Sequence, residues 1–157
     1  MEVPDVDDRE DRDERNARKS AWFHEHFQSG VGFNAHIGVR IPRWDPEGVE
    51  FHLALRPELG AHDGVFHGGV LAALIDTCGC GAVLAGHDFS TGSRISTVDL
   101  SVQFLRVAGS DVVAHGTCVK RGRNLNFAEV VIRDASGKDV ARGTVTAMIA
   151  GERRGVE

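Results

Sequence analysis

The chain lacks several features that would place it in a specialised class of protein. It has no Tyr and only 3 Cys and 4 Pro among 157 residues, and its formal net charge is −5. Cys78 and Cys80 stand two residues apart and Cys118 stands alone, so the cysteines form no disulfide framework and no C-x-x-C repeat. A reducing compartment is therefore expected. A negative net charge gives no reason to expect nucleic acid as a partner.

Long apolar runs are also missing. No uninterrupted apolar run reaches about 18 residues, which argues against an ordinary membrane span. The first residues do not follow the basic, apolar and small-residue order of a signal peptide, so the expected location is the cytoplasm. His24 and His26 would point apart on a helix, with no ligand partner at metal-binding spacing, and we expect no metal site.

The composition divides the chain into three parts. Residues 1–14 hold eight acidic residues and two arginines with almost no apolar surface, which predicts a disordered acidic tail. Residues 15–150 are long enough to form one domain with its own core. Residues 151–157 are expected to form a flexible C-terminus.

Hydrophobic periodicity predicts an α+β domain. Apolar residues recur at helical spacing over 16–28, whereas 49–55 alternates as a strand and can pair with 35–41 across the turn at 44–48. Residues 68–85 are apolar nearly all round, with Gly86 placed to end a helix. Strand-like runs follow at 94–107, 111–121, 124–134 and 139–150. Such a helix must be buried on most sides, and a curved antiparallel sheet of about five to six strands can wrap it.

One carboxylate, Asp76, interrupts the most apolar segment of the chain. It could pair with a surface arginine, or it could be a buried carboxylate kept for chemistry. Burying an unpaired charge is costly, so such a residue usually has a partner or a function.

The predicted start of this helix, at Gly68, offers free N–H groups and the positive end of the helix dipole. Asp76 lies eight residues on, roughly 12 Å further along the axis. One chain therefore cannot bring both groups to one small reacting centre. Two antiparallel copies related by a two-fold axis could do so, which places a catalytic site across a dimer.

The segment G-x-x-H-G-G-V-L-A-A-L-I-D-T, at 64–77, resembles the signature of hotdog-fold thioesterases. The likeness is to the phenylacetic-acid-degradation branch (PaaI-like) of the 4-hydroxybenzoyl-CoA thioesterase superfamily. STVDLSVQFLR and GKDVARGTVTAMI are similar to later strands of that family. The resemblance implies a long central helix wrapped by a curved sheet. It also implies a homodimer, often paired into a tetramer, that hydrolyses acyl-CoA without metal or cofactor.

The resemblance also implies residue roles. The Gly68 N–H would polarise the thioester carbonyl, with Gly69 beside it. Asp76 of the partner subunit would act on water as general base, or attack as nucleophile, and Thr97 would help to hold the water. On simple strand alternation, however, Thr97 lies off the apolar face formed by Val98, Leu100, Val102 and Phe104.

One departure from the family concerns the substrate carbonyl. An Asn common in the family is replaced here by Ala61, and His62 or Asp63 would have to substitute for it. Losing one oxyanion-type donor can cost about 2.7–4 kcal/mol of transition-state stabilisation.

Other residues carry two interpretations each. His67 could touch the substrate or could shape the turn through hydrogen bonds to the backbone. Phe104 would wall the acyl pocket. Lys120, Arg121 and Arg123 could bind the phosphates of CoA or form an ordinary charged hairpin tip.

Three functions are therefore open. The first is an acyl-CoA thioesterase acting on an aryl or medium-chain acyl group. The second is a hotdog hydratase or dehydratase acting on an acyl thioester, with His67 as a partner. The third is a non-catalytic acyl-CoA-binding module, which the Ala61 substitution favours. The carrier could be CoA or an acyl-carrier protein.

Overall fold

The computed structural model describes residues 6–62 and 64–156, except for the side chains of residues 6–8. Its helices are α1 (Val6–Glu25), α2 (Gly32–Ile37) and α3 (Gly68–Ala85), with short turns of helix at His26–Gly30, Pro57–Leu59 and Phe89–Thr91. Its strands are β1 (Arg40–Asp45), β2 (Gly48–Leu53), β3 (Ile95–Phe104), β4 (Val112–Arg121), β5 (Leu125–Asp134) and β6 (Asp139–Ile149).

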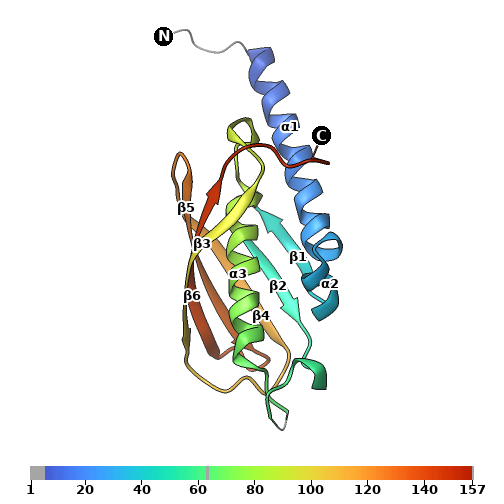
Figure 1. The fold of residues 1–157 in the computed structure, drawn as a ribbon, viewed down its shortest axis with the longest axis vertical. Coiled ribbons are helices and arrows are strands. Elements are labelled where there is room, and N and C mark those ends of the chain that lie inside the picture. Colours follow the sequence, from blue (N-terminus) through green and yellow to red (C-terminus); the bar gives the residue numbers. More distant parts are fainter. Residues whose placement is uncertain (1–5, 63, 157) are drawn as a thin grey trace.

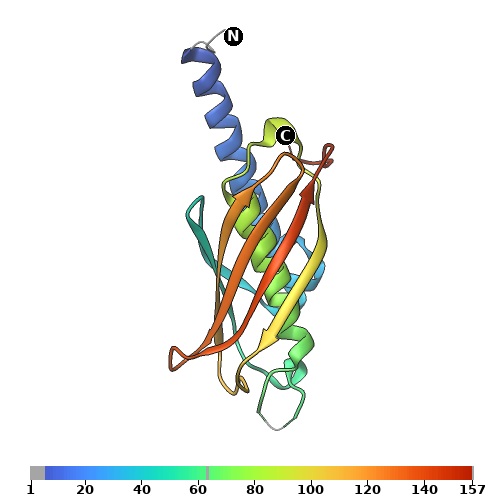
Figure 2. The same cartoon turned by 90° about the vertical axis from the view of Figure 1, so that its left-hand side faces the viewer.

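The strands form one antiparallel sheet in the order β1-β2-β4-β5-β6-β3. The sheet curves around α3, as Figures 1 and 2 show from two sides. This is the hotdog arrangement that the sequence predicts, and the four strand-like runs after residue 94 are each confirmed as a strand. β1 and β3 form the two edges of the sheet.

Helix α3 begins and ends where the apolar pattern predicts, and Gly86 caps it. By length and composition alone α3 could cross a membrane, but 61% of it is buried inside the fold. Position 143 of β6 shows how closely sheet and helix approach. A Cβ atom there would lie 2.8 Å from Ile75 Cγ2 on α3 and 2.5 Å from the Ser101 carbonyl oxygen, so only glycine fits.

The expected strand over 35–41 is wrong in its first half. Residues 32–37 form α2, and Gly38 ends that helix with φ of 81°, a conformation that favours glycine. Its N–H bonds to the carbonyls of Asn34 and Ala35. The strand therefore begins only at Arg40, and β1 pairs with β2 across the expected turn.

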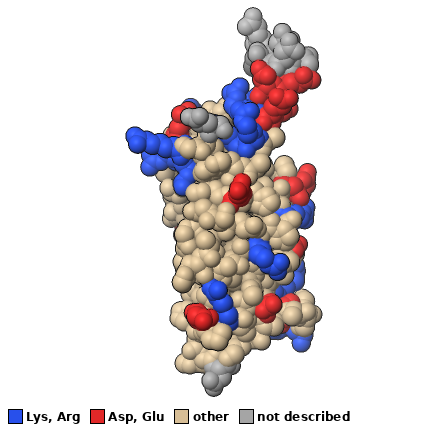
Figure 3. All heavy atoms as spheres, turned by 90° about the vertical axis from the view of Figure 1, so that its right-hand side faces the viewer, with Lys and Arg blue, Asp and Glu red and all other residues tan. Residues whose placement is uncertain are grey.

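The N-terminal helix is longer than the predicted range 16–28. α1 starts at Val6, so residues 6–14, predicted as a disordered tail, are helical here, and residues 1–5 lie outside the described residues. In its exposed first half, acidic residues stand four positions before basic ones, as Asp11 does before Arg15. Oppositely charged side chains at this spacing attract one another and stabilise a helix that packs against nothing. Figure 3 shows these charges gathered at one end of the molecule.

The C-terminal segment also differs from the flexible tail that was predicted. The Arg153 N–H donates to Ser93 Oγ at 2.7 Å, and the Arg153 guanidinium lies 6.0 Å from the centre of the Trp22 ring on α1. Val156 is buried. These contacts hold the described part of the segment against α1.

Candidate active site

The first turn of α3 is held by His67. The His67 Nδ1 accepts a hydrogen bond from the Gly69 N–H at 2.9 Å, and the His67 carbonyl accepts from Val70 and Leu71. His67 therefore shapes this turn through hydrogen bonds to the backbone, one of its two expected roles. Within the described residues, the Gly68 N–H has no hydrogen-bond partner, so it remains available at the positive end of the helix dipole.

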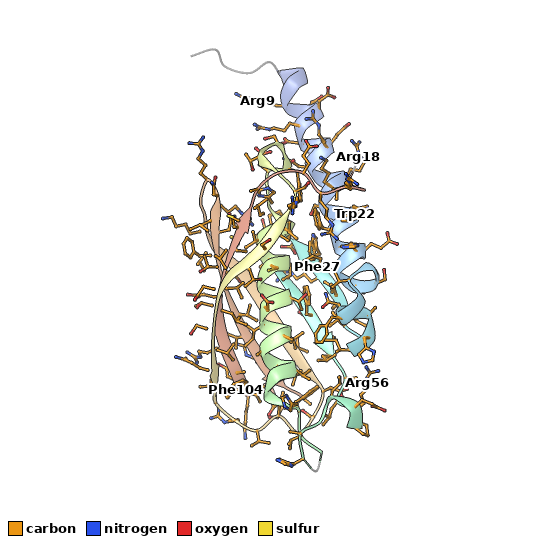
Figure 4. The ribbon with its side chains drawn as sticks, viewed as in Figure 1. Arg9, Arg18, Trp22, Phe27, Arg56 and Phe104 are labelled. Carbon is orange, nitrogen blue, oxygen red and sulfur yellow. The ribbon has the colours of Figure 1, made fainter. Side chains whose placement is uncertain are left out.

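Phe104 lies over this helix start. A Cβ atom at position 68 would lie 3.4 Å from the Phe104 Cζ, so the ring covers one side of the Gly68 backbone. The side chain is 56% exposed. Figure 4 shows Phe104 at the end of the sheet where α3 begins. The ring therefore forms an apolar wall beside the start of α3.

Asp76 is half-buried in the middle of α3 and contacts the edge strand. Thr97 Oγ1 on β3 donates a hydrogen bond to Asp76 Oδ1 at 2.6 Å. In the described part of the chain, no hydrogen bond reaches Asp76 Oδ2. The carboxylate is thus fixed through one oxygen and open at the other, the arrangement a general base or nucleophile requires.

A β-bulge explains why simple alternation misplaces Thr97. Thr97 pairs with Ala147 and Asp99 with Thr146, so Val98 is an extra residue on β3. Directly opposed residues share a face, and Ala147 and Val145 are buried toward α3, so their partners Thr97 and Leu100 both face the helix. The bulge shifts the alternation by one residue and turns Thr97 toward Asp76.

A third side chain joins this pair. Cys80 stands one turn after Asp76, with its Sγ 3.3 Å from Thr97 Oγ1 and 4.0 Å from Asp76 Oδ1. Burial raises the pKa of the Cys80 thiol to about 11, and the nearby Asp76 charge adds to that rise. Sequence patterns did not single out Cys80 as a residue of the site. Its i, i+4 spacing from Asp76 was the signal for this contact.

The loop before α3 carries the departure from the family pattern. Ala61 and His62 are both exposed and line a hollow of about 540 Å³ beside Arg56. The loop is closed by hydrogen bonds from Ala61 N–H to the Val65 carbonyl and from Val65 N–H to the His62 carbonyl. No described hydrogen bond brings the His62 ring to the start of α3. Asp63, the other expected substitute, lies outside the described residues.

The cluster of cations lies at the opposite end of α3. The Arg121 guanidinium donates to the carbonyls of Val83 and, at 3.3 Å, Ala82, so it caps the last turn of the helix. Arg121 and Arg123 both line a hollow of about 520 Å³ with His87. Lys120 is exposed on the same hairpin but does not line this hollow.

A buried amide on α2 anchors the residue after Asp76. Asn34 Nδ2 donates to Thr77 Oγ1 at 2.8 Å and to the Phe27 carbonyl at 2.9 Å, and the side chain is buried. Sequence patterns did not single out Asn34, because the predicted strand over 35–41 hid its place at the start of a helix. This bond fixes the middle of α3 from the side opposite the sheet.

The comparisons with known proteins show the family to which the chain belongs. The model of the thioesterase superfamily matches residues 63–141, which includes α3 and all of its contacts with β3. The chain belongs to that superfamily, whose members share this fold, and it is a thioester hydrolase.

Individual relatives can be compared with this chain both by sequence identity and by fold. A proposed esterase of Mycobacterium tuberculosis is 32% identical over 118 residues, 73% of this chain and 84% of that protein. Its solved structure matches with a TM-score of 0.72, covering 78% of this chain and 99% of that one. A thioesterase-superfamily protein of Shewanella oneidensis matches with a TM-score of 0.74 at 25% identity, covering 86% and 97%. A Streptococcus pneumoniae protein titled a hypothetical thioesterase, solved with coenzyme A, has the same fold, at a TM-score of 0.63, 23% identity and coverage of 73% and 88%.

Proposed function

We propose that this protein hydrolyses acyl-CoA thioesters in a homodimer, with Gly68 of one subunit and Asp76 of the other at each reacting centre. The observation that carries the proposal is the Asp76–Thr97 hydrogen bond of 2.6 Å in the middle of the core helix. The Gly68 N–H, which has no hydrogen-bond partner among the described residues, lies eight residues away on that helix, roughly 12 Å along its axis.

The residues would divide the chemistry as follows. Thr97 holds Asp76 Oδ1, and Oδ2 takes a proton from water as the water oxygen attacks the thioester carbonyl. The Gly68 N–H and the helix dipole stabilise the negative charge that develops on the carbonyl oxygen. The C–S bond then breaks, and CoA leaves as thiol with the proton that Asp76 took. Direct attack by Asp76, followed by hydrolysis of an anhydride, uses the same contacts.

The edge strand supports the dimer. Val98, Leu100 and Phe104 of β3 are each at least 38% exposed, and the Leu105 and Val107 side chains beyond it are also exposed. An apolar edge strand with unpaired backbone groups is a template for pairing with a second copy.

The register of such pairing follows from two contacts already described. Thr97 touches Asp76, and Phe104 touches the start of α3. An antiparallel pairing of β3 with its copy, centred on Ser101 and with Val98 as the extra residue, would set Thr97 opposite the other subunit's Phe104. That register would bring the Gly68 N–H of one subunit beside Asp76 of the other. The site would then be complete only in the dimer.

The thiol carrier is proposed to be CoA. Arg123 lines the hollow at the end of α3 beside His87, and a guanidinium suits the phosphates of a nucleotide. Arg121 is already engaged with the helix carbonyls, so we assign the phosphate contact to Arg123. The Streptococcus pneumoniae protein of the same fold was solved with coenzyme A, which agrees with this choice.

The test is release of free thiol from a panel of aryl and aliphatic acyl-CoA thioesters. Asp76→Asn should keep the fold and the dimer and lose most turnover. Glu129→Gln, which changes an exposed carboxylate on the central strand β5, is the matched control and should keep wild-type turnover. An Asp76→Asn protein with near-normal turnover would overturn the assignment.

The same panel separates the non-catalytic alternative, which the exposed Ala61 favours. A binding module would retain acyl-CoA with no thiol release, measurable by calorimetry on the wild-type protein. The hydratase alternative predicts a hydroxyacyl or enoyl thioester as product in place of free thiol, and His67 could act in it only through Nε2, because Nδ1 accepts from the Gly69 N–H.

A further inference from the structure

The thiol of Cys80 has no role in the mechanism above, yet it touches the group that holds Asp76. Cys80 Sγ lies 3.3 Å from Thr97 Oγ1, and only 7% of the residue is exposed. Cys78, two residues earlier on the same helix, is fully buried against β4, where a Cβ atom at Gly116 would meet its sulfur at 2.9 Å. The two thiols therefore have different surroundings on opposite sides of α3.

Counting donors fixes the direction of the Cys80 contact. An ionised carboxylate only accepts hydrogen bonds, so the 2.6 Å contact uses the single O–H of Thr97 as donor to Asp76. The remaining capacity of the Thr97 oxygen is as an acceptor. Burial raises the pKa of the Cys80 thiol to about 11, so the S–H is present at neutral pH. Of the two acceptors within reach, Thr97 Oγ1 at 3.3 Å lies closer to the sulfur than Asp76 Oδ1 at 4.0 Å, so the S–H donates to Thr97.

We infer that Cys80 is a positioning residue: its S–H donates to Thr97 Oγ1 and thereby commits the Thr97 hydroxyl to the Asp76 carboxylate. This inference rests on the proposed function of Asp76. Without the S–H, the Thr97 hydroxyl can rotate away, and the carboxylate loses its held oxygen for part of the time. Hydrogen bonds in such a chain strengthen one another, so loss of the first donor weakens the second bond.

Three variants test the inference. Cys80→Ala removes the donor, Cys80→Ser restores one, and Cys78→Ala removes a buried thiol of the same helix that does not touch Thr97. Cys80→Ala should lower kcat by roughly three- to tenfold, the effect of a modest hydrogen bond, with KM unchanged. Cys80→Ser should recover most of the loss, and Cys78→Ala should keep the wild-type kcat and KM.

A second readout does not depend on turnover. The S–H stretching band of Cys80, assigned by its loss in Cys80→Ala, should shift toward the free-thiol position in Thr97→Val. A Cys80→Ala protein with the wild-type kcat would overturn this inference alone, as would an S–H band that Thr97→Val leaves in place. A wild-type protein that releases no thiol from any acyl-CoA would instead overturn the proposed function, and with it any role of Cys80 in turnover.

Discussion

The hydrogen bond between Thr97 and Asp76 allows a quantitative test of the site. Thr97→Val keeps the shape of the side chain and removes the hydroxyl that donates at 2.6 Å to Asp76 Oδ1. A hydrogen bond to a charged group contributes roughly 1.5–3 kcal/mol. If that whole amount is lost from the transition state, kcat should fall by roughly 10- to 150-fold.

The exposure of the Thr97 side chain decides where in that range the loss of kcat should fall. Thr97 is exposed in the single chain, which favours the lower end, whereas pairing of β3 with a second copy would cover it and favour the upper end. Steady-state thiol release from the best acyl-CoA substrate measures the effect. Thr97→Ser, which retains the hydroxyl, should restore turnover to within a few-fold of wild type.

A matched control separates loss of the hydroxyl from damage to the sheet. Thr144 on β6 is exposed and pairs with Ser101 of β3, so Thr144→Val makes the same chemical change next to the same strand without contacting Asp76. It should leave kcat unchanged. If Asp76→Asn is inactive while Thr97→Val and Thr144→Val both turn over at the wild-type rate, Thr97 has no part in the reaction and the reasoning from its geometry is refuted.

Much of the fold could be predicted from residue patterns because they reflect burial. The apolar residues on nearly all sides of α3 and the alternation in the strands after residue 94 are both local periodic patterns. These elements were therefore predicted correctly. The start of β1 could not be predicted in the same way. The alternation over 35–41 fits a strand, but Gly38 adopts a left-handed conformation that ends a helix, and a capped helix of one or two turns leaves little periodic signal.

The site residues also divide into those that a local sequence pattern reveals and those that depend on the folded structure. Asp76 stood out because a charge in an apolar helix needs a partner or a function, and Gly68 stood out because that helix begins with it. The orientation of Thr97 could not be predicted, since one extra residue in β3, Val98, inverts the alternation, and a bulge depends on the pairing with β6. The cap formed by Arg121 was similarly hidden, because only the folded hairpin brings it to the end of α3.

Two further predictions concern the far end of α3. Arg121→Met should lower the free energy of unfolding by about 1 kcal/mol, because it removes the hydrogen bonds to the last carbonyls of the helix. Arg123→Met should leave the free energy of unfolding unchanged and raise KM for acyl-CoA. Equal effects of the two variants in thermal unfolding and in kinetics would contradict this division of roles. His87 sets a pH dependence, since burial lowers the pKa of its imidazole in the folded protein while its Nε2 donates to the Gly92 carbonyl at 3.0 Å. The unfolded chain, with an ordinary pKa near 6.5, then binds the proton more readily than the folded protein, so the stabilisation is complete above about pH 6.5 and declines as the pH falls toward the folded value. The melting temperature should therefore drop between pH 7.5 and 5.5, and His87→Asn should make that drop shallower; a variant with the wild-type slope would show that the proton binds elsewhere.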